Sequence, residues 1–164
     1  MFFVVAHPSF SFNPSQVTKT EDGLEALVFI AEGDMRQAIN NLQATVAGFG
    51  LVNADNVFKV CDQPHPVVLK RMVKHCVEGE YDSAYMHLES LWSLGYSALD
   101  IIGTLFRVVK TYEMSEYLKL EYLKSIGFVH MRITEGVSSI VQLSGLLASL
   151  SRQSGRIENI IAPR

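Results

Sequence analysis

The sequence has few cysteines, little net charge and no apolar run long enough to cross a membrane. Only Cys61 and Cys76 occur in 164 residues. Two cysteines are too few for a disulfide framework, so we interpret both as reduced thiols of an intracellular protein. A formal net charge of -3 argues against a free-standing, strongly basic nucleic-acid binder. The apolar run from Ile140 to Leu150 is about half of the ~20 residues that a bilayer requires, which predicts no transmembrane helix.

Motifs for catalysis and metal binding are also missing. No Gly-x-x-x-x-Gly-Lys-Ser/Thr loop is present to hold a triphosphate through backbone N–H groups, and no Gly-x-Ser-x-Gly nucleophile elbow occurs. The five histidines are spread over separate segments. His75, Cys76 and His87 could in principle meet, but their spacing matches no zinc pattern. We therefore predict no catalytic residue and no metal site in this chain.

The composition is that of a folded, helical chain. A hydrophobic fraction of 48% with 19% charged residues is typical of a globular protein that buries its own core. Helical periodicity begins near Thr18 and continues almost to the end, whereas no segment keeps the alternation of a strand. Residues 1–16 show no periodicity and are expected to be an unstructured leader. The predicted fold class is all-α.

Three helices are expected before residue 62. Thr18 or Thr20 can cap the first helix, and Gly33 ends it. The second begins at Asp34, which stands at capping-box spacing from Gln37, and the third covers about 53–61. The predicted inward-facing residues are Leu24, Leu27, Val28 and Ala31 in the first helix, and Met35, Ile39, Leu42 and Val46 in the second.

The strongest break in the chain is the segment 62–66, Asp-Gln-Pro-His-Pro. The two prolines disfavour helix at the residues before them, so we place a domain boundary here. Five helices are expected beyond it, with Trp92 and Phe106 among their inward-facing residues. The third of these is apolar on more than one face, which predicts that it is central in its bundle or meets another chain. Their expected ranges are about 66–78, 81–94, 97–112, 115–135 and 138–151.

Arg36 is the residue whose position most suggests a function. It lies in the first turn of the helix that Asp34 caps, where the helix dipole disfavours a cation. Arg36, Asn40 and Gln43 recur at i, i+4 and i+7 as a polar ridge. A guanidinium at a helix N-terminus is suited to binding a phosphate. The alternative is a solvated arginine on a polar face, and the residues alone favour that alternative.

A resemblance to a known family changes this balance. Residues 33–43, Gly-Asp-Met-Arg-Gln-Ala-Ile-Asn-Asn-Leu-Gln, resemble the sensor 2 motif of the replication factor C small subunits, which are AAA+ clamp-loader ATPases. The Gly-Leu-Glu-Ala segment at 23–26 resembles the preceding helix of their lid subdomain. Residues 56–66, 94–97, 100–103 and 116–121 are similar to the same family, most of all to its second subunit. The resemblance covers about residues 20–150.

The resemblance implies a division into lid and collar. Residues 17–62 would be part of the AAA+ lid subdomain, and residues 63–151 the helical collar through which five subunits form a ring. Residues 152–164 would be a flexible tail. Arg36 matches the arginine that reaches the γ-phosphate of ATP in the same subunit, so ATP and Mg would bind only in the full-length context. Expected partners are the other subunits, with the sliding clamp and primer-template DNA reached through the assembled, nuclear complex.

The chain also departs from the family. The phosphate loop, the metal-binding acidic motif and the arginine finger belong to a first subdomain that these 164 residues lack. We therefore expect a fragment that supplies subunit assembly without hydrolysing ATP. One alternative is that the native gene product is longer and is a full clamp-loading ATPase. Another is a free-standing helical protein-interaction module with no role in replication.

Overall fold

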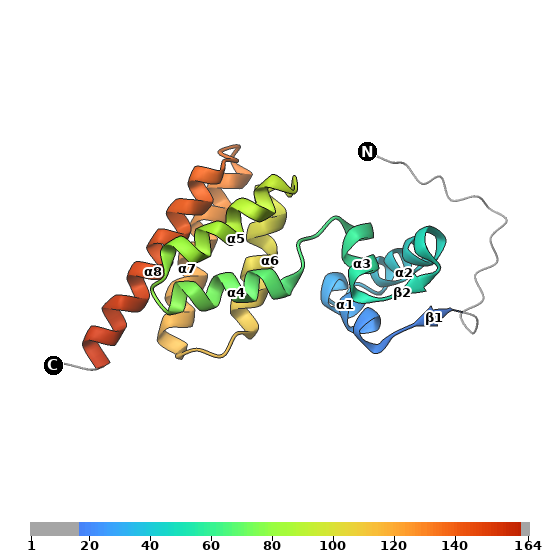
Figure 1. The fold of residues 1–164 in the computed structure, drawn as a ribbon, viewed down its shortest axis with the longest axis horizontal. Coiled ribbons are helices and arrows are strands. Elements are labelled where there is room, and N and C mark those ends of the chain that lie inside the picture. The colour runs from blue at the N-terminus through green and yellow to red at the C-terminus, as the bar shows by residue number, and fades with distance from the viewer. Residues whose placement is uncertain (1–16, 162–164) are drawn as a thin grey trace. The chain divides into compact units, whose positions relative to one another are not determined.

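The computed structural model describes the backbone of residues 17–161 and contains eight helices and one short pair of strands in that range (Figure 1). The predicted all-α class is confirmed. The leader expected at 1–16 lies outside the described residues, as do residues 162–164. The elements are β1 (Thr18–Lys19), α1 (Glu21–Ala31), α2 (Met35–Phe49), β2 (Leu51–Val52), α3 (Ala54–Cys61), α4 (Pro66–Val77), α5 (Tyr81–Ser93), α6 (Ala98–Thr111), α7 (Glu116–Thr134) and α8 (Ile140–Ile161).

The chain divides between Asp62 and Gln63 into two compact units, here called the N-terminal and the C-terminal unit. Asp62 ends α3 in the left-handed conformation at φ 51°. His65 caps α4, whose first residue is Pro66. A proline suits that position because its fixed φ is helical and its missing N–H would have no partner within the helix. Each unit has its own hydrophobic core.

The N-terminal unit packs α1, α2 and α3 around one small core. Of the two expected candidates, Thr20 and not Thr18 caps α1, and its hydroxyl accepts from Gly23 N–H at 3.2 Å. Its backbone N–H also donates to the carbonyl of Val52 at 3.0 Å. That bond follows the parallel pairing of β1 with β2, which the sequence pattern did not predict because each strand has only two residues. The core residues are Ala26, Leu27, Ile30, Val52, Val57 and Phe58.

Half of the inward-facing residues expected in α1 and α2 are in fact exposed. Val28 is 71% exposed and Leu24 37%, because α1 turns the face of Gly23, Ala26, Leu27 and Ile30 inward. In α2, Leu42 and Val46 pack against the core as predicted. The prediction was wrong for Met35 and Ile39, which are 73% and 51% exposed.

The C-terminal unit is a bundle of five helices, α4 to α8, as predicted. The third, α6, contacts α4, α7 and α8 and buries apolar residues on several sides, which explains its surplus of apolar side chains. That surplus is used inside the unit. Phe106 is nevertheless 41% exposed, so the prediction that it faces inward was wrong, whereas Trp92 is partly buried and packs against the core. The buried residues of α6 are Ala98, Ile101, Ile102, Thr104, Leu105, Val108 and Val109.

The last helix, α8, does not end at 151 but continues to Ile161, which corrects the expectation of a flexible tail for residues 152–161. Two polar contacts tie this extension to α7. The hydroxyls of Tyr122 and Ser154 lie 2.6 Å apart, and Gln153 Nε2 donates to Ser125 Oγ at 2.9 Å. The Tyr122 hydroxyl also donates to the carbonyl of Leu150 at 3.1 Å. Buried polar groups that find partners at such positions favour a continued helix.

Candidate functional site

The surroundings of Arg36 are set by the cap of α2. The carboxylate of Asp34 accepts from the N–H groups of Arg36 at 2.9 Å and Gln37 at 3.2 Å. The second half of a capping box does not form, because the Gln37 amide donates to Asn41 at 3.4 Å instead of turning back to Asp34. Since Asp34 occupies these N–H groups, an anion arriving here would have to be held by the guanidinium of Arg36 and not by the helix N-terminus.

The exposed face of α2 carries the predicted polar ridge. Arg36, Asn40 and Gln43 are all exposed and follow one another along this face. Met35 and Ile39 lie beside them and are also exposed. Among the described residues, none pairs with the Arg36 guanidinium. The face therefore combines a free cation with uncovered apolar side chains.

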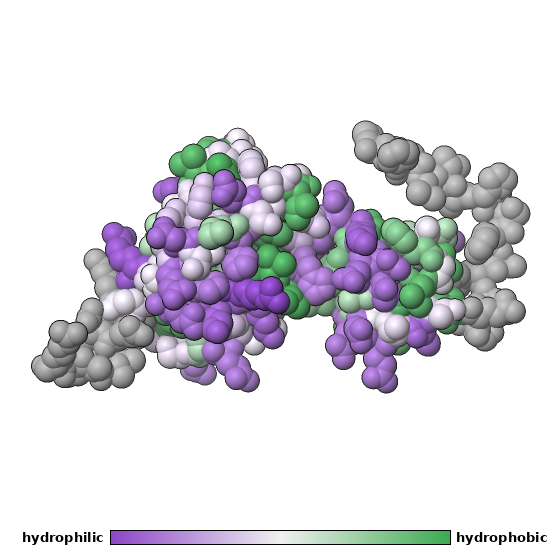
Figure 2. All heavy atoms as spheres, in the orientation of Figure 1, coloured by the Kyte–Doolittle hydropathy of each residue, from purple (hydrophilic) through white to green (hydrophobic). Residues whose placement is uncertain are grey.

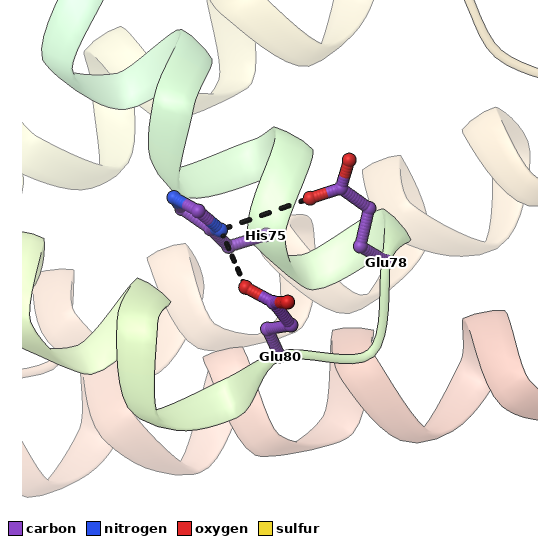
Figure 3. Close-up of side chains that lie close together, drawn as sticks. All are labelled: His75, Glu78 and Glu80. Atoms are coloured by element: carbon purple, nitrogen blue, oxygen red, sulfur yellow. Dashed lines mark hydrogen bonds and ion pairs between the residues drawn. The ribbon is translucent and has the colours of Figure 1, made fainter.

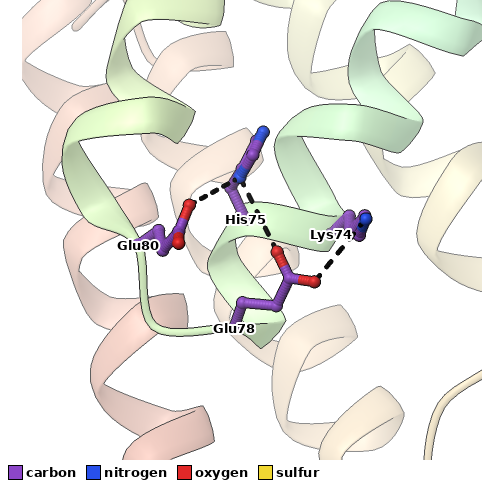
Figure 4. Close-up of polar contacts among 4 residues, drawn as sticks. All are labelled: Lys74, His75, Glu78 and Glu80. Atoms are coloured by element: carbon purple, nitrogen blue, oxygen red, sulfur yellow. Dashed lines mark hydrogen bonds and ion pairs between the residues drawn. The ribbon is translucent and has the colours of Figure 1, made fainter.

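A second group of polar side chains, which the sequence did not predict, gathers at the turn between α4 and α5 (Figure 3). His75 Nδ1 lies 3.0 Å from a carboxylate oxygen of Glu80 and 3.8 Å from one of Glu78. Lys74 approaches the other oxygen of Glu78 at 3.7 Å (Figure 4). One nitrogen and two carboxylate oxygens of these three residues lie within 4.8 Å of one another.

Of the three residues that could in principle meet, His75, Cys76 and His87, only the two histidines form one group. The rings of His75 and His87 are stacked, with centroids 5.6 Å apart and an interplanar angle of 23°. Burial lowers the pKa of His87, and the neighbouring His75 and Arg71 lower it further. Cys76 is not part of this group, because its side chain is fully buried in the core of the C-terminal unit.

A groove runs between α7 and α8 on the C-terminal unit. It has a volume of about 630 Å³. Phe128 and Val141 on its walls are 56% and 69% exposed. Arg132 and Gln142 add polar atoms to the lining. Hydrophobic surface is visible over both units in Figure 2.

The signals available in the sequence explain what was found and what was missed. The position of Arg36 followed from Asp34, because capping residues are recognisable from local spacing. The group at the α4–α5 turn was missed because His75, Glu78 and Glu80 have no familiar metal-ligand spacing. Gly79, between the two glutamates, was the available sign of a turn that brings them together. In the structure it has a φ of 77° and reverses the chain there. Within the described residues, every helix is too short or too polar to span a bilayer.

Comparison with known proteins agrees with the resemblance noted in the sequence. Residues 64–149 match the replication factor C C-terminal domain. Replication factor C subunit 4 of Oryza sativa is 61% identical over 136 residues, and subunit 2 of Arabidopsis thaliana is 58% identical over 136 residues. Both alignments cover 83% of this chain and 41% of the relative. Subunit 4 of Saccharomyces cerevisiae is 51% identical over 141 residues, which are 85% of this chain and 43% of the relative.

The chain thus spans about two-fifths of the length of these curated relatives. The matched domain extends over more than half of the 164 residues and coincides with the helices of the C-terminal unit. The predicted likeness to the second subunit is consistent with relatives named subunit 2 and subunit 4. From its five-helix bundle and from these matches, the chain belongs to the replication factor C family and contains the family's C-terminal domain.

Proposed function

We propose that this chain acts in a DNA clamp loader as the lid-and-collar part of a replication factor C small subunit. In this proposal, residues 17–62 are part of the AAA+ lid and residues 63–151 are the collar that joins neighbouring subunits. The observation that carries it is the match of residues 64–149 to the replication factor C C-terminal domain. The relatives are named as numbered subunits, which supports an assembly role.

The surface of the C-terminal unit supports the same proposal. Phe128 and Val141 leave apolar area open on the walls of the α7–α8 groove. Large exposed apolar patches mark protein–protein contacts more often than free surface. A second replication factor C subunit is the proposed occupant. The other partners, namely the sliding clamp and primer-template DNA, would be reached through the assembled complex in the nucleus.

Arg36 is the proposed nucleotide-sensing residue. Its side chain is exposed at the start of α2, and Asp34 holds the first turn in place. A guanidinium suits the planar, multiply charged oxygens of a phosphate, so Arg36 would contact the γ-phosphate of ATP bound with Mg in a full-length subunit. These 164 residues contain no phosphate loop. We therefore expect the purified chain to bind and hydrolyse no ATP by itself.

Co-expression with the other replication factor C small subunits tests the proposal. A tag on this chain should capture those subunits, and the purified chain alone should show no ATPase activity above buffer. If capture fails while the chain is folded by circular dichroism, the assembly role is wrong and a free-standing interaction module is favoured. ATP hydrolysis by the chain alone would contradict the proposal that these residues serve assembly and do not hydrolyse ATP by themselves.

A further inference from the structure

We propose that His75, Glu78 and Glu80, at the turn between α4 and α5, form a binding site for a divalent transition-metal ion, with Zn²⁺ as the ion that fits best. This site is separate from Arg36 and from the α7–α8 groove. The inference does not depend on the proposed clamp-loader role, because it rests on contacts within the C-terminal unit.

The spacing of the three side chains suits a tetrahedral ion. Zinc bonds to histidine nitrogen and carboxylate oxygen are about 2.0–2.2 Å long, so ligand atoms around one ion lie about 3.3–3.6 Å apart. His75 Nδ1 lies 3.0 Å from Glu80 and 3.8 Å from Glu78, on either side of that range. The ligand oxygens of Glu78 and Glu80 lie within 4.8 Å of each other, so these two side chains would draw together around a bound ion. Figure 3 shows both carboxylates directed at the same ring nitrogen.

The backbone already holds the ligands together. Glu80 N–H donates to the carbonyl of His75 at 2.8 Å, and Gly79 N–H donates to that of Cys76 at 3.2 Å. These bonds are those of a helix end closed by a left-handed glycine, and they fix the two glutamates on either side of Gly79. An ion would therefore meet a pre-ordered site and would not have to order a flexible loop.

The imidazole is also oriented before an ion binds. The ring of His87 on α5 stacks on His75 and limits its rotation. For Nδ1 of His75 to bind a cation, the proton of the neutral ring must sit on Nε2. The hydrogen bond between Nδ1 and Glu80 is then replaced by one bond from Nδ1 to the ion and one from the Glu80 carboxylate to the ion. The mixed set of one imidazole and two carboxylates suits Zn²⁺. With three protein ligands, a water molecule would complete the tetrahedron.

Positively charged side chains near the site oppose the binding of a metal ion, so removing one of them tests the proposal. Lys74 Nζ approaches Glu78 at 3.7 Å and would have to move away when Glu78 binds a metal (Figure 4). Arg71 lies close enough to influence His87. Removing the charge of Lys74 should therefore strengthen metal binding, whereas a purely structural role of the group predicts no such effect.

Titration of the full chain with zinc chloride against a chromogenic zinc chelator tests the site. The expected result is one ion per chain, with affinity reduced roughly tenfold or more in His75→Asn and in Glu80→Gln. Lys74→Gln should bind more tightly than the native chain. Zinc should raise the melting temperature of the native chain, because an ion that binds only the folded state stabilises it, and the two ligand variants should lose this shift.

Matched variants separate this site from incidental binding. His130→Asn removes an exposed histidine on α7, and Glu121→Gln removes a carboxylate that pairs with Lys124 at 3.9 Å. Neither should change the affinity. Cys61→Ser should also leave it unchanged, which excludes binding through that thiol. Absence of zinc binding, or equal affinity in the ligand and control variants, would overturn the proposal.

Discussion

The two cysteines differ in their surroundings and therefore in their chemistry. Burial in the core raises the pKa of the Cys76 thiol to about 11, although the neighbouring Ser151 hydroxyl works against that shift. Cys61 is half-buried, and burial also raises its pKa. A thiol reacts as its thiolate, so a raised pKa and burial both slow its reaction.

We predict that a thiol reagent modifies Cys61 in the native chain and reaches Cys76 only when the chain unfolds. The measurement is the time course of modification by a chromogenic disulfide at pH 8. Cys61→Ser should remove the faster phase and leave the slower one. If both thiols of the native chain were modified equally fast, the buried placement of Cys76 would be contradicted.

Because folding raises the pKa of Cys76, the contribution of this thiol to the stability of the fold is complete below about pH 8.5 and is lost as the pH rises toward 11.

For Arg36 we predict an effect on nucleotide response without an effect on folding. Arg36→Ala should change the free energy of unfolding by less than about 0.5 kcal/mol, because the side chain is exposed. In a full-length subunit the same change should weaken the response of the complex to ATP. Lys59→Ala, which removes an exposed cation from α3, is the control. A clear loss of thermal stability in Arg36→Ala would instead show that the arginine is structural.

The sequence predicted the role of a residue well where that role depends on neighbours in the chain, and poorly where it depends on packing against distant segments. Asp34 was identified as a cap, and Thr20 was one of two candidates with Thr18, because capping depends on neighbours in sequence. Met35 and Ile39 were expected inside because they continue the stripe of Leu42 and Val46. They are exposed because, among the described residues, the core of the N-terminal unit reaches only the later turns of α2. Periodicity alone cannot show how far a partner helix extends.

At the scale of elements, Gly23 sets how closely α1 approaches β2. A Cβ at this position would meet the carbonyl of Val52 and would lie 2.9 Å from the Cα of Asn53. Both are backbone atoms, so a larger side chain cannot be accommodated by rotating a neighbour. The absence of a side chain at Gly23 is therefore a packing requirement of the N-terminal unit.

Gly23→Ala should destabilise the N-terminal unit by roughly 1–3 kcal/mol, because α1 must move away from β2. Gly48→Ala in α2 is the matched control, since a Cβ there meets nothing within 4 Å. The control should be neutral or stabilising by up to about 1 kcal/mol, because alanine favours helix. Urea denaturation with amide exchange in α1 measures both variants. Equal stability of the two would contradict the close approach of α1 to β2.

The α7–α8 groove gives a prediction about assembly. Val141→Glu should reduce capture of the other small subunits roughly tenfold or more, because a buried, unpaired carboxylate opposes association. Met86→Glu on α5 is the control, since Met86 is 70% exposed and Val141 69%. Quantitative pull-down after co-expression measures the effect. An equal loss in both variants would indicate that the groove is not the contact.

At the scale of the whole molecule, the chain consists of two units with separate cores. The proline-containing segment 62–66 indicated the division, because prolines interrupt helical periodicity without any need for tertiary information. The number of helices in the C-terminal unit also followed from the sequence. The continuation of α8 to Ile161 did not, because its contacts with Tyr122 and Ser125 link residues 28 to 32 positions apart.

The central claim is that the C-terminal unit joins this chain to other replication factor C subunits. Native mass spectrometry of the chain co-expressed with those subunits tests it most directly. We predict a complex whose mass includes one copy of this chain, and its loss in Val141→Glu but not in Met86→Glu. A native chain that is folded but found only alone, while the other subunits assemble with one another, would contradict the claim.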